Sequence, residues 1–324
     1  MQQSRRAFIS SLAVSPLAVP SVASANETWP ARPIRCIVPL PPGGGTDSVA
    51  RLSMQRLSEA LGVPVVVENK PGAGGTLGSD IVAKAEPDGY TIGIATASSH
   101  AAAPAFRKDL PYDPVKSFTA ITLLGTTPYI LIGGPAAGAR DLQGFIANAK
   151  AQPGKLTSAS VGVSTLGYLL TRQFELIAGL KMVDVPYKGS ALAYPDLMNG
   201  TVAVMLDNPS GSAGLVRDGR LIGFAVTRRS PVLPDVPTFE SLGVKDFDAA
   251  FWYGVVAPAG LSPEIAQRIQ RALADGMLAG PGATALRALD VEPVLSTPQS
   301  FAETMAKQTA DLSALADRLG IKPE

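Results

Sequence analysis

The stretch that decides the fold is Pro39-Leu-Pro-Pro-Gly-Gly-Gly-Thr-Asp47, a proline- and glycine-rich loop near the start of the chain. The apolar run Ile34–Val38 before it predicts a buried strand, and the spacing of apolar residues after it predicts a helix over Ser48–Leu61. Glycines let the backbone approach a ligand without Cβ atoms in the way. Because the first N–H groups of a helix have no intrahelical partner, this loop predicts an anion-binding site.

The loop favours a small carboxylate over a nucleotide. A phosphate-binding P-loop needs G-x-x-x-x-G-K-[ST], and no lysine follows here. The dinucleotide fingerprint G-x-G-x-x-G fails as well, because Ser48 stands at its last position. The alternative is a tight strand–helix turn that binds nothing. The candidate ligand-binding residues of the loop are Pro42, Gly43, Gly44, Thr46 and Asp47, the last of which would repel a polyphosphate.

Composition excludes several classes of function. The chain has 324 residues, of which 46% are hydrophobic and 17% charged, and its formal net charge is +1. These values describe a globular protein large enough for two domains, without a basic nucleic-acid-binding surface. A single cysteine excludes an internal disulfide, and one histidine with one cysteine argues against a transition-metal site. We therefore expect no metal, no other cofactor and no nucleic-acid partner.

The first 25 residues have the pattern of an export signal. Arg5-Arg6 resembles a twin-arginine signal, the run Ile9–Val22 is apolar, and Ala23-Ser24-Ala25 matches a cleavage site. Cleavage after Ala25 is expected to release the mature protein into the periplasm. Two alternatives stay open: export by the general secretory route, and an uncleaved membrane anchor, for which the apolar run is short.

In the first hundred residues of the mature chain, predicted strands alternate with predicted helices, which indicates a parallel sheet with right-handed crossovers. Ligands of such sheets bind beyond the carboxyl ends of the strands. Three loops leave those ends, namely Pro39–Asp47, Asn69–Gly75 and Thr96–His100. The candidates in the third loop, which bind a carboxylate or cap the next helix, are Ser98, Ser99 and His100. A serine–histidine nucleophile is disfavoured, because adjacent residues seldom have that geometry and the chain has no G-x-S-x-G motif.

A second α/β unit follows an interruption at residues 125–128. Its first strand ends in a Gly/Ser/Thr loop that is the counterpart of the first loop across a cleft. The candidate ligand-binding residues of that loop are Val163, Ser164 and Thr165. Lys188 follows the next strand and is either a contact for an anionic ligand or a solvated lysine. Asp207 follows the strand after that and either accepts from a donor group of the ligand or caps a helix.

The chain is expected to cross between the two units twice. The proline-rich residues 228–237 indicate a return crossing, and the aromatic run Phe251–Pro258 indicates a strand that rejoins the first unit. We expect residues 26–125 and 228–324 to form lobe 1 and residues 126–227 to form lobe 2. Each lobe is predicted to be a mainly parallel sheet flanked by helices, with a ligand cleft between the lobes.

Ordered motifs along the mature chain carry a family resemblance. They are Trp29-Pro-x-Arg-Pro-Ile-Arg35, Pro41-Pro-Gly-Gly-Gly-Thr-Asp47, Glu68-Asn-Lys-Pro-Gly-Ala-Gly-Gly75, Pro87-Asp-Gly-Tyr90, Val185-Pro-Tyr-Lys-Gly189, Leu233-Pro-Asp-Val-Pro-Thr238, and Trp252-Tyr-Gly254 with Ala257-Pro-Ala-Gly260. They resemble the Bug receptors, the substrate-binding receptors of tripartite tricarboxylate transporters. The resemblance covers essentially the whole mature chain.

The resemblance implies a type II periplasmic binding-protein fold and a receptor rather than an enzyme. It implies that loop amides and hydroxyls facing the cleft bind a small carboxylate, often through water, and that the partners are the membrane subunits of such a transporter. We expect a monomer. The alternative function is a sensor that presents its ligand to a membrane histidine kinase.

The second-lobe loop departs from the family pattern, in which Asn-Gly-Thr or a similar polar sequence is common. Here Val163, Leu166 and Tyr168 make the loop less polar. If they line the cleft, burying a second carboxylate there costs several kcal/mol, whereas an apolar body gains roughly 25 cal/mol per Å² buried. The loop therefore predicts an aromatic or branched monocarboxylate in preference to citrate.

Overall fold

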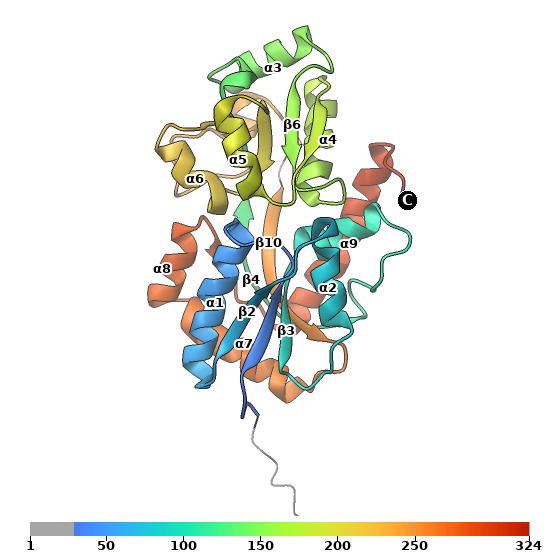
Figure 1. The fold of residues 1–324 in the computed structure, drawn as a ribbon, viewed down its shortest axis with the longest axis vertical. Coiled ribbons are helices and arrows are strands. Elements are labelled where there is room, and N and C mark those ends of the chain that lie inside the picture. The colour runs from blue at the N-terminus through green and yellow to red at the C-terminus, as the bar shows by residue number, and fades with distance from the viewer. Residues whose placement is uncertain (1–28, 248, 324) are drawn as a thin grey trace, which may run out of the picture.

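The computed structural model describes residues 29–247 and 249–323, which form two lobes stacked end to end (Figure 1). The export segment predicted at residues 1–25 lies outside the described residues. Within the described part of the chain, no helix is both long and apolar enough to cross a membrane.

Lobe 1 is a six-stranded sheet with helices on its faces. Its strands are β1 (Ile34–Val38), β2 (Val65–Asn69), β3 (Thr91–Thr96), β4 (Phe118–Pro128), β10 (Ala250–Pro258) and β11 (Glu292–Pro293). Its helices are α1 (Gly45–Leu61), α2 (Thr76–Ala83), α7 (Pro263–Met277), α8 (Gly280–Ala288) and α9 (Pro298–Arg318). Short 3₁₀ turns lie at Ala73–Gly75 and Ala103–Ala105, and a π-helical turn lies at Ser98–Ala102. A further 3₁₀ turn at Glu240–Leu242 packs on lobe 2, where Gln143 Nε2 donates to the Leu242 carbonyl at 3.0 Å.

Lobe 2 is a five-stranded sheet, again with helices on its faces. Its strands are β5 (Ile130–Gly133), β6 (Thr157–Ser160), β7 (Val183–Pro186), β8 (Val204–Asp207) and β9 (Ile222–Val226). Its helices are α3 (Leu142–Ala151), α4 (Leu166–Ala178), α5 (Ser190–Asn199) and α6 (Pro209–Arg217), with a 3₁₀ turn at Pro135–Ala137.

Strand order explains where a ligand meets each lobe. In lobe 1 the order is β11-β4-β10-β3-β1-β2, and in lobe 2 it is β7-β6-β8-β5-β9. The strands that neighbour β1 on its two sides, β2 and β3, are parallel to it, and β7 and β8 flank β6 in the same way. The direction in which successive strands are added to the sheet reverses between β1 and β3 in lobe 1 and between β6 and β8 in lobe 2. Ligands of open α/β sheets bind beyond the carboxyl ends of the strands at such points.

The predicted two-lobed α/β class is confirmed, and both sheets are mixed. β10 is antiparallel to β3 and β4, and β5 is antiparallel to β8 and β9. The antiparallel share of the strand pairs is larger than predicted, because the alternation of strands and helices in the sequence predicts mainly parallel sheets. The reason is that β5 and β10 start at the junction of the lobes and run away from it, against strands that run towards it.

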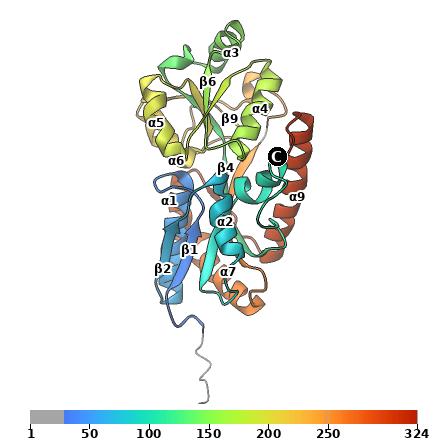
Figure 2. The ribbon, with the colours of Figure 1, turned by 45° about the vertical axis from the view of Figure 1, so that its right-hand side comes forward.

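Apolar periodicity correctly predicts the core. Ile34, Cys36, Ile37 and Val38 of β1 are fully buried, and β1 lies between β2 and β3 in the lobe 1 sheet. Helix α7 buries one face through Ala266, Ile269, Leu273 and Met277, the spacing of an amphipathic helix. Figure 2 shows the long α9 lying along lobe 1.

One helix begins earlier than the sequence predicts, and one helix has no counterpart in the sequence prediction. Helix α1 begins at Gly45, three residues early, because Gly44 is extended and serves as N-cap without a side chain. Helix α8 begins Gly280-Pro-Gly, which is typical of a turn. It forms nevertheless because it packs closely on α7: a Cβ at Gly282 would lie 1.9 Å from the carbonyl oxygen of Gly276.

The two connections between the lobes are tied together at Thr227. Its Oγ1 accepts from the Tyr129 N–H at 2.9 Å and donates to the Ala249 carbonyl at 2.6 Å. Tyr129 lies between β4 and β5, and Thr227 and Ala249 lie between β9 and β10. The lobes therefore meet at a narrow double connection, the place where hinge motion between them is expected.

Candidate functional site

A cavity of about 270 Å³ lies between the lobes. Its lobe 1 wall comes from the loop between β1 and α1, with Gly74, Ser98 and Phe251. Its lobe 2 wall comes from the loops that follow β6, β7 and β8. These are the carboxyl ends of parallel strands in both lobes, so the cavity lies where the two strand orders reverse.

Four helices begin at this cavity. Gly44 and Gly45 start α1, Thr165 caps α4, Gly189 and Ser190 start α5, and Asn208 precedes α6; all six residues line the wall. No described side chain caps α1, α5 or α6. The first N–H groups of a helix carry partial positive charge, so the convergence creates an anion-binding environment.

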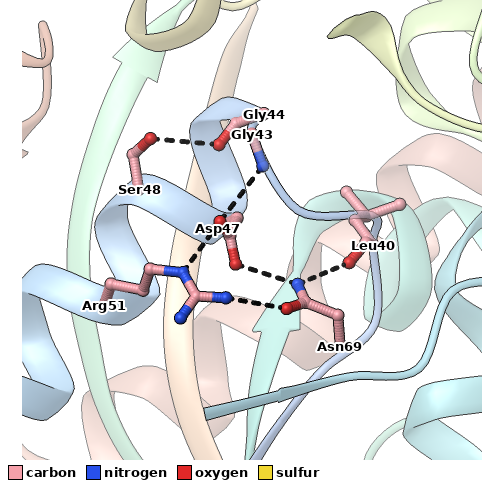
Figure 3. Close-up of polar contacts among 7 residues, drawn as sticks. All are labelled: Leu40, Gly43, Gly44, Asp47, Ser48, Arg51 and Asn69. Carbon is pink, nitrogen blue, oxygen red and sulfur yellow. Dashed lines mark hydrogen bonds and ion pairs between the residues drawn. The ribbon is translucent and has the colours of Figure 1, made fainter. Parts of the chain in front are cut away.

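Asp47 supports the first loop from behind (Figure 3). Its carboxylate accepts from the Gly43 N–H at 3.1 Å, from Arg51 Nε at 3.0 Å and from Asn69 Nδ2 at 2.9 Å. Asn69 Nδ2 also donates to the Leu40 carbonyl at 2.9 Å. Burial alone would raise the pKa of Asp47, but these hydrogen bonds outweigh it and lower the pKa. Asp47 is thus ionised and committed to holding the loop.

Asp207 stands on the opposite wall in a different environment. It is 4% exposed, and its carboxylate accepts from Ser190 Oγ at 2.9 Å and from the Tyr194 hydroxyl at 2.7 Å. Burial raises the pKa of Asp207, and the hydrogen bonds from Tyr194 and Ser190 reverse this only in part. Among the described residues that line the cavity, it is the one acidic side chain, and none is a lysine or arginine.

The structure brings together six of the predicted ligand-binding residues. Those that line the cavity are Pro42, Gly44, Thr46, Ser98, Thr165 and Asp207. Those that lie outside its wall are Gly43, Asp47, Ser99, His100, Val163, Ser164 and Lys188. Gly43 and Asp47 act on the loop geometry, as described above.

Ser99 and His100 are turned into the lobe 1 core. Both are fully buried, with Ser99 Oγ 2.9 Å from His100 Nδ1. The imidazole packs against the rings of Tyr112 and Phe118, and burial lowers the pKa of His100 to about 3. The pair is therefore neutral and part of the packing. Of the three candidate residues in this loop, Ser98 alone reaches the cavity, because the π-helical turn at Ser98–Ala102 directs the next two side chains into the core.

The side chains expected to give the cavity its apolar character do not line it. Val163 is 53% exposed, Leu166 is buried in the core, and Tyr168 packs edge-on against Phe106. The prediction that Val163, Leu166 and Tyr168 line the cavity is therefore wrong. The wall is nevertheless largely apolar through other residues, which are Leu40, Tyr129, Val161, Leu192, Met205, Leu206 and Phe251.

In the loop after β7, the structure agrees with the second alternative for Lys188, a solvated lysine. Lys188 is exposed, while the next two residues, Gly189 and Ser190, line the cavity and start α5. The signal that could have found them is the same strand–Gly/Ser–helix pattern that identified the first loop. Tyr129 and Phe251 flank the interlobe connections, and their sequence carries no such signal.

The lobes touch around the cavity. The first N–H of α4, from Leu166, donates to Ser98 Oγ at 3.2 Å. Ser210 Oγ of α6 lies 2.9 Å from the Tyr253 hydroxyl of β10, and a Cβ at Gly45 would lie 2.2 Å from the same Oγ. Two hydroxyl contacts and a close glycine packing therefore close the lobes over the cavity.

Comparison with known proteins agrees with this architecture. Residues 49–321 match the model of the tripartite tricarboxylate transporter family receptors. Protein BugT of Bordetella pertussis is 34% identical over 91% of this chain and 92% of its own. The structure of R. palustris Rpa4515 with adipate superposes with a TM-score of 0.88 at 32% identity, over 91% of this chain and all of its own.

A further solved structure, MatC from Rhodopseudomonas palustris with bound malate, superposes with a TM-score of 0.84 at 29% identity. The match covers 89% of this chain and all of that chain. The matched family model is that of transporter receptors, and both solved structures share the two-lobed fold described above. The chain therefore belongs to the tripartite tricarboxylate transporter receptor family.

Proposed function

We propose that this chain is a periplasmic receptor that captures a small carboxylate between its lobes and delivers it to the membrane subunits of a tripartite tricarboxylate-type transporter. The observation that carries the proposal is the convergence of four helix N-termini on a cavity whose described wall holds no lysine or arginine. The family and the carboxylates bound by Rpa4515 and MatC support it.

The carboxylate binds through loop amides at α1 and hydroxyls such as those of Thr46 and Ser98. Each hydrogen bond to an ionised group contributes roughly 1.5–3 kcal/mol net. A few such bonds with buried apolar contacts reach roughly micromolar affinity, about −8 kcal/mol. The apolar wall favours an aromatic or branched body over a second or third carboxylate, which would lose its hydration there.

Delivery depends on lobe closure. In this proposal, the two sheets with their helices move as the two lobes about the connections at Tyr129 and Thr227. Residues 238–247, which the sequence assigns to lobe 1, move with lobe 2, because Phe239 and Phe247 pack on Phe174 of α4. The closed, loaded monomer is the form that the membrane subunits recognise. Residues 1–25 direct export to the periplasm, and the protein carries no catalytic activity and no cofactor.

The test is a thermal-shift screen of the purified mature protein against citrate, dicarboxylates, aromatic and branched monocarboxylates, and neutral sugars. Binding raises the melting temperature. We expect shifts with carboxylates alone, and a larger shift with an aromatic or branched monocarboxylate than with citrate. A response to sugars without any response to acids contradicts the proposal. Cellular uptake of the identified acid should require both this chain and the membrane subunits.

A further inference from the structure

The charge of Asp207 has no cationic partner on the cavity wall. Within the described residues, no ion pair involves Asp207, and no lysine or arginine lines the cavity. The side chains that donate to its carboxylate, Ser190 and Tyr194, are neutral. A buried carboxylate compensated only by neutral groups gains from any donor that a ligand brings, and most from a cationic one.

Asp207 lies next to the N-terminal end of α1, where the ligand carboxylate is proposed to bind. A Cβ at Gly211 would lie 2.5 Å from the Tyr194 hydroxyl and 3.4 Å from the Gly45 N–H nitrogen. The hydroxyl that donates to Asp207 and the first amide of α1 are therefore neighbours. A ligand carboxylate at α1 would place the atoms adjacent to that carboxylate close to Asp207.

Asn208 adds a second polar group to the same wall. Its Nδ2 is buried, and no described residue accepts a hydrogen bond from it. An acceptor, Asp207, and a donor, Asn208, thus stand side by side. Together they complement a ligand that carries a donor group next to its own carboxylate oxygens, and they oppose a bare second carboxylate, which would meet a like charge.

We propose that Asp207 is a specificity-determining residue that binds an ammonium or hydroxyl group carried by the ligand close to its carboxylate. The inference rests on the proposed function and names the ligand class more closely: amino or hydroxy acids in preference to plain acids. An ammonium group is preferred over a hydroxyl, because only the ammonium compensates the charge of Asp207.

Two matched ligand series test this by titration calorimetry on the mature protein. One is succinate, malate and aspartate; the other is 3-phenylpropionate, 3-phenyllactate and phenylalanine. Within each series the backbone is constant and the donor changes from none to hydroxyl to ammonium. In at least one series we expect the amino acid to bind on the order of tenfold or more tightly than the plain acid, with the hydroxy acid between them.

The variant Asp207→Asn should bring the ratio of the two affinities, amino acid to plain acid, towards one. The matched control is Asp184→Asn, because burial also raises the pKa of Asp184, which accepts from Ser160 Oγ at 3.2 Å and does not line the cavity. The control should keep the wild-type ratio. Melting temperatures of both variants verify that they are folded.

Two results overturn the inference while leaving the proposed function standing. One is that wild-type protein binds the plain acids as tightly as the amino and hydroxy acids. The other is that the ratio survives Asp207→Asn, which would make Asp207 a structural residue that only balances the helix N-termini. If no acid of either series binds, the proposed function fails, and the inference fails with it. The wild-type comparison decides the matter even if Asp207→Asn does not fold.

Discussion

Asp47 and Asp207 are both buried acids beside strand–helix junctions, one in each lobe, and they are used in opposite ways. Asp47 is 5% exposed and Asp207 4% exposed. Arg51, Asn69 and the Gly43 amide hold Asp47 and lower its pKa. Only neutral groups, namely hydroxyls and the Asn208 backbone amide, donate to Asp207, whose pKa is raised by burial. The acid with a cationic partner, Asp47, holds the loop, whereas the acid with only neutral partners, Asp207, is the one that we propose meets the ligand.

The largest stability effect expected from this comparison is at Asp47. Asp47→Ala leaves the Gly43 N–H and Asn69 Nδ2 without their acceptor and should lower the free energy of unfolding by about 2–3 kcal/mol. Denaturant unfolding measures it. The matched control is Asp311→Ala, which removes an exposed acid paired with Lys307 one helical turn away and should cost less than about 0.5 kcal/mol. Equal losses for the two variants would show that Asp47 does not organise the loop.

A smaller effect of opposite sign is expected at Asp207. A raised folded-state pKa means that the acid favours folding below its unfolded pKa, near the ordinary 3.8, and that this contribution is lost as pH rises through the folded value. Asp207→Asn should therefore match wild type near pH 4 and become more stable by on the order of 1 kcal/mol at pH 7. Unfolding curves across this pH range measure it. A variant that is less stable at every pH would contradict the assigned role.

Local pattern predicts where the cavity loops are, because strand ends and glycine-rich helix starts are sequence-local features. It does not predict which side chain of a loop faces the cavity. Ser98 reaches the wall and Ser99 does not, since a π-helical turn sets the direction of each side chain. His100 of that turn packs on Tyr112 and Phe118, residues that lie outside the loop itself.

The same limit applies in lobe 2. Lys188 attracts attention because it is charged, yet it stands one residue before the helix cap and points to solvent. Val163 is apolar and still exposed at the tip of its loop. In both cases the chemical type of the side chain does not predict whether the residue lines the cavity. The strand–glycine–helix arrangement at Gly189 does predict it.

The central claim is that main-chain amides of the first loop bind the carboxylate, and Gly44→Val tests it most directly. Gly44 is extended, and a Cβ there would meet no atom within 4 Å, so valine fits the fold while its side chain occupies the loop surface that the ligand approaches. Calorimetry with the acid that raises the melting temperature most should show affinity reduced at least about 100-fold. Lys188→Ala, the control at an exposed cation, should leave affinity within a few-fold of wild type. Loss of binding in Lys188→Ala with binding retained in Gly44→Val would contradict the claim and move the site to the lysine.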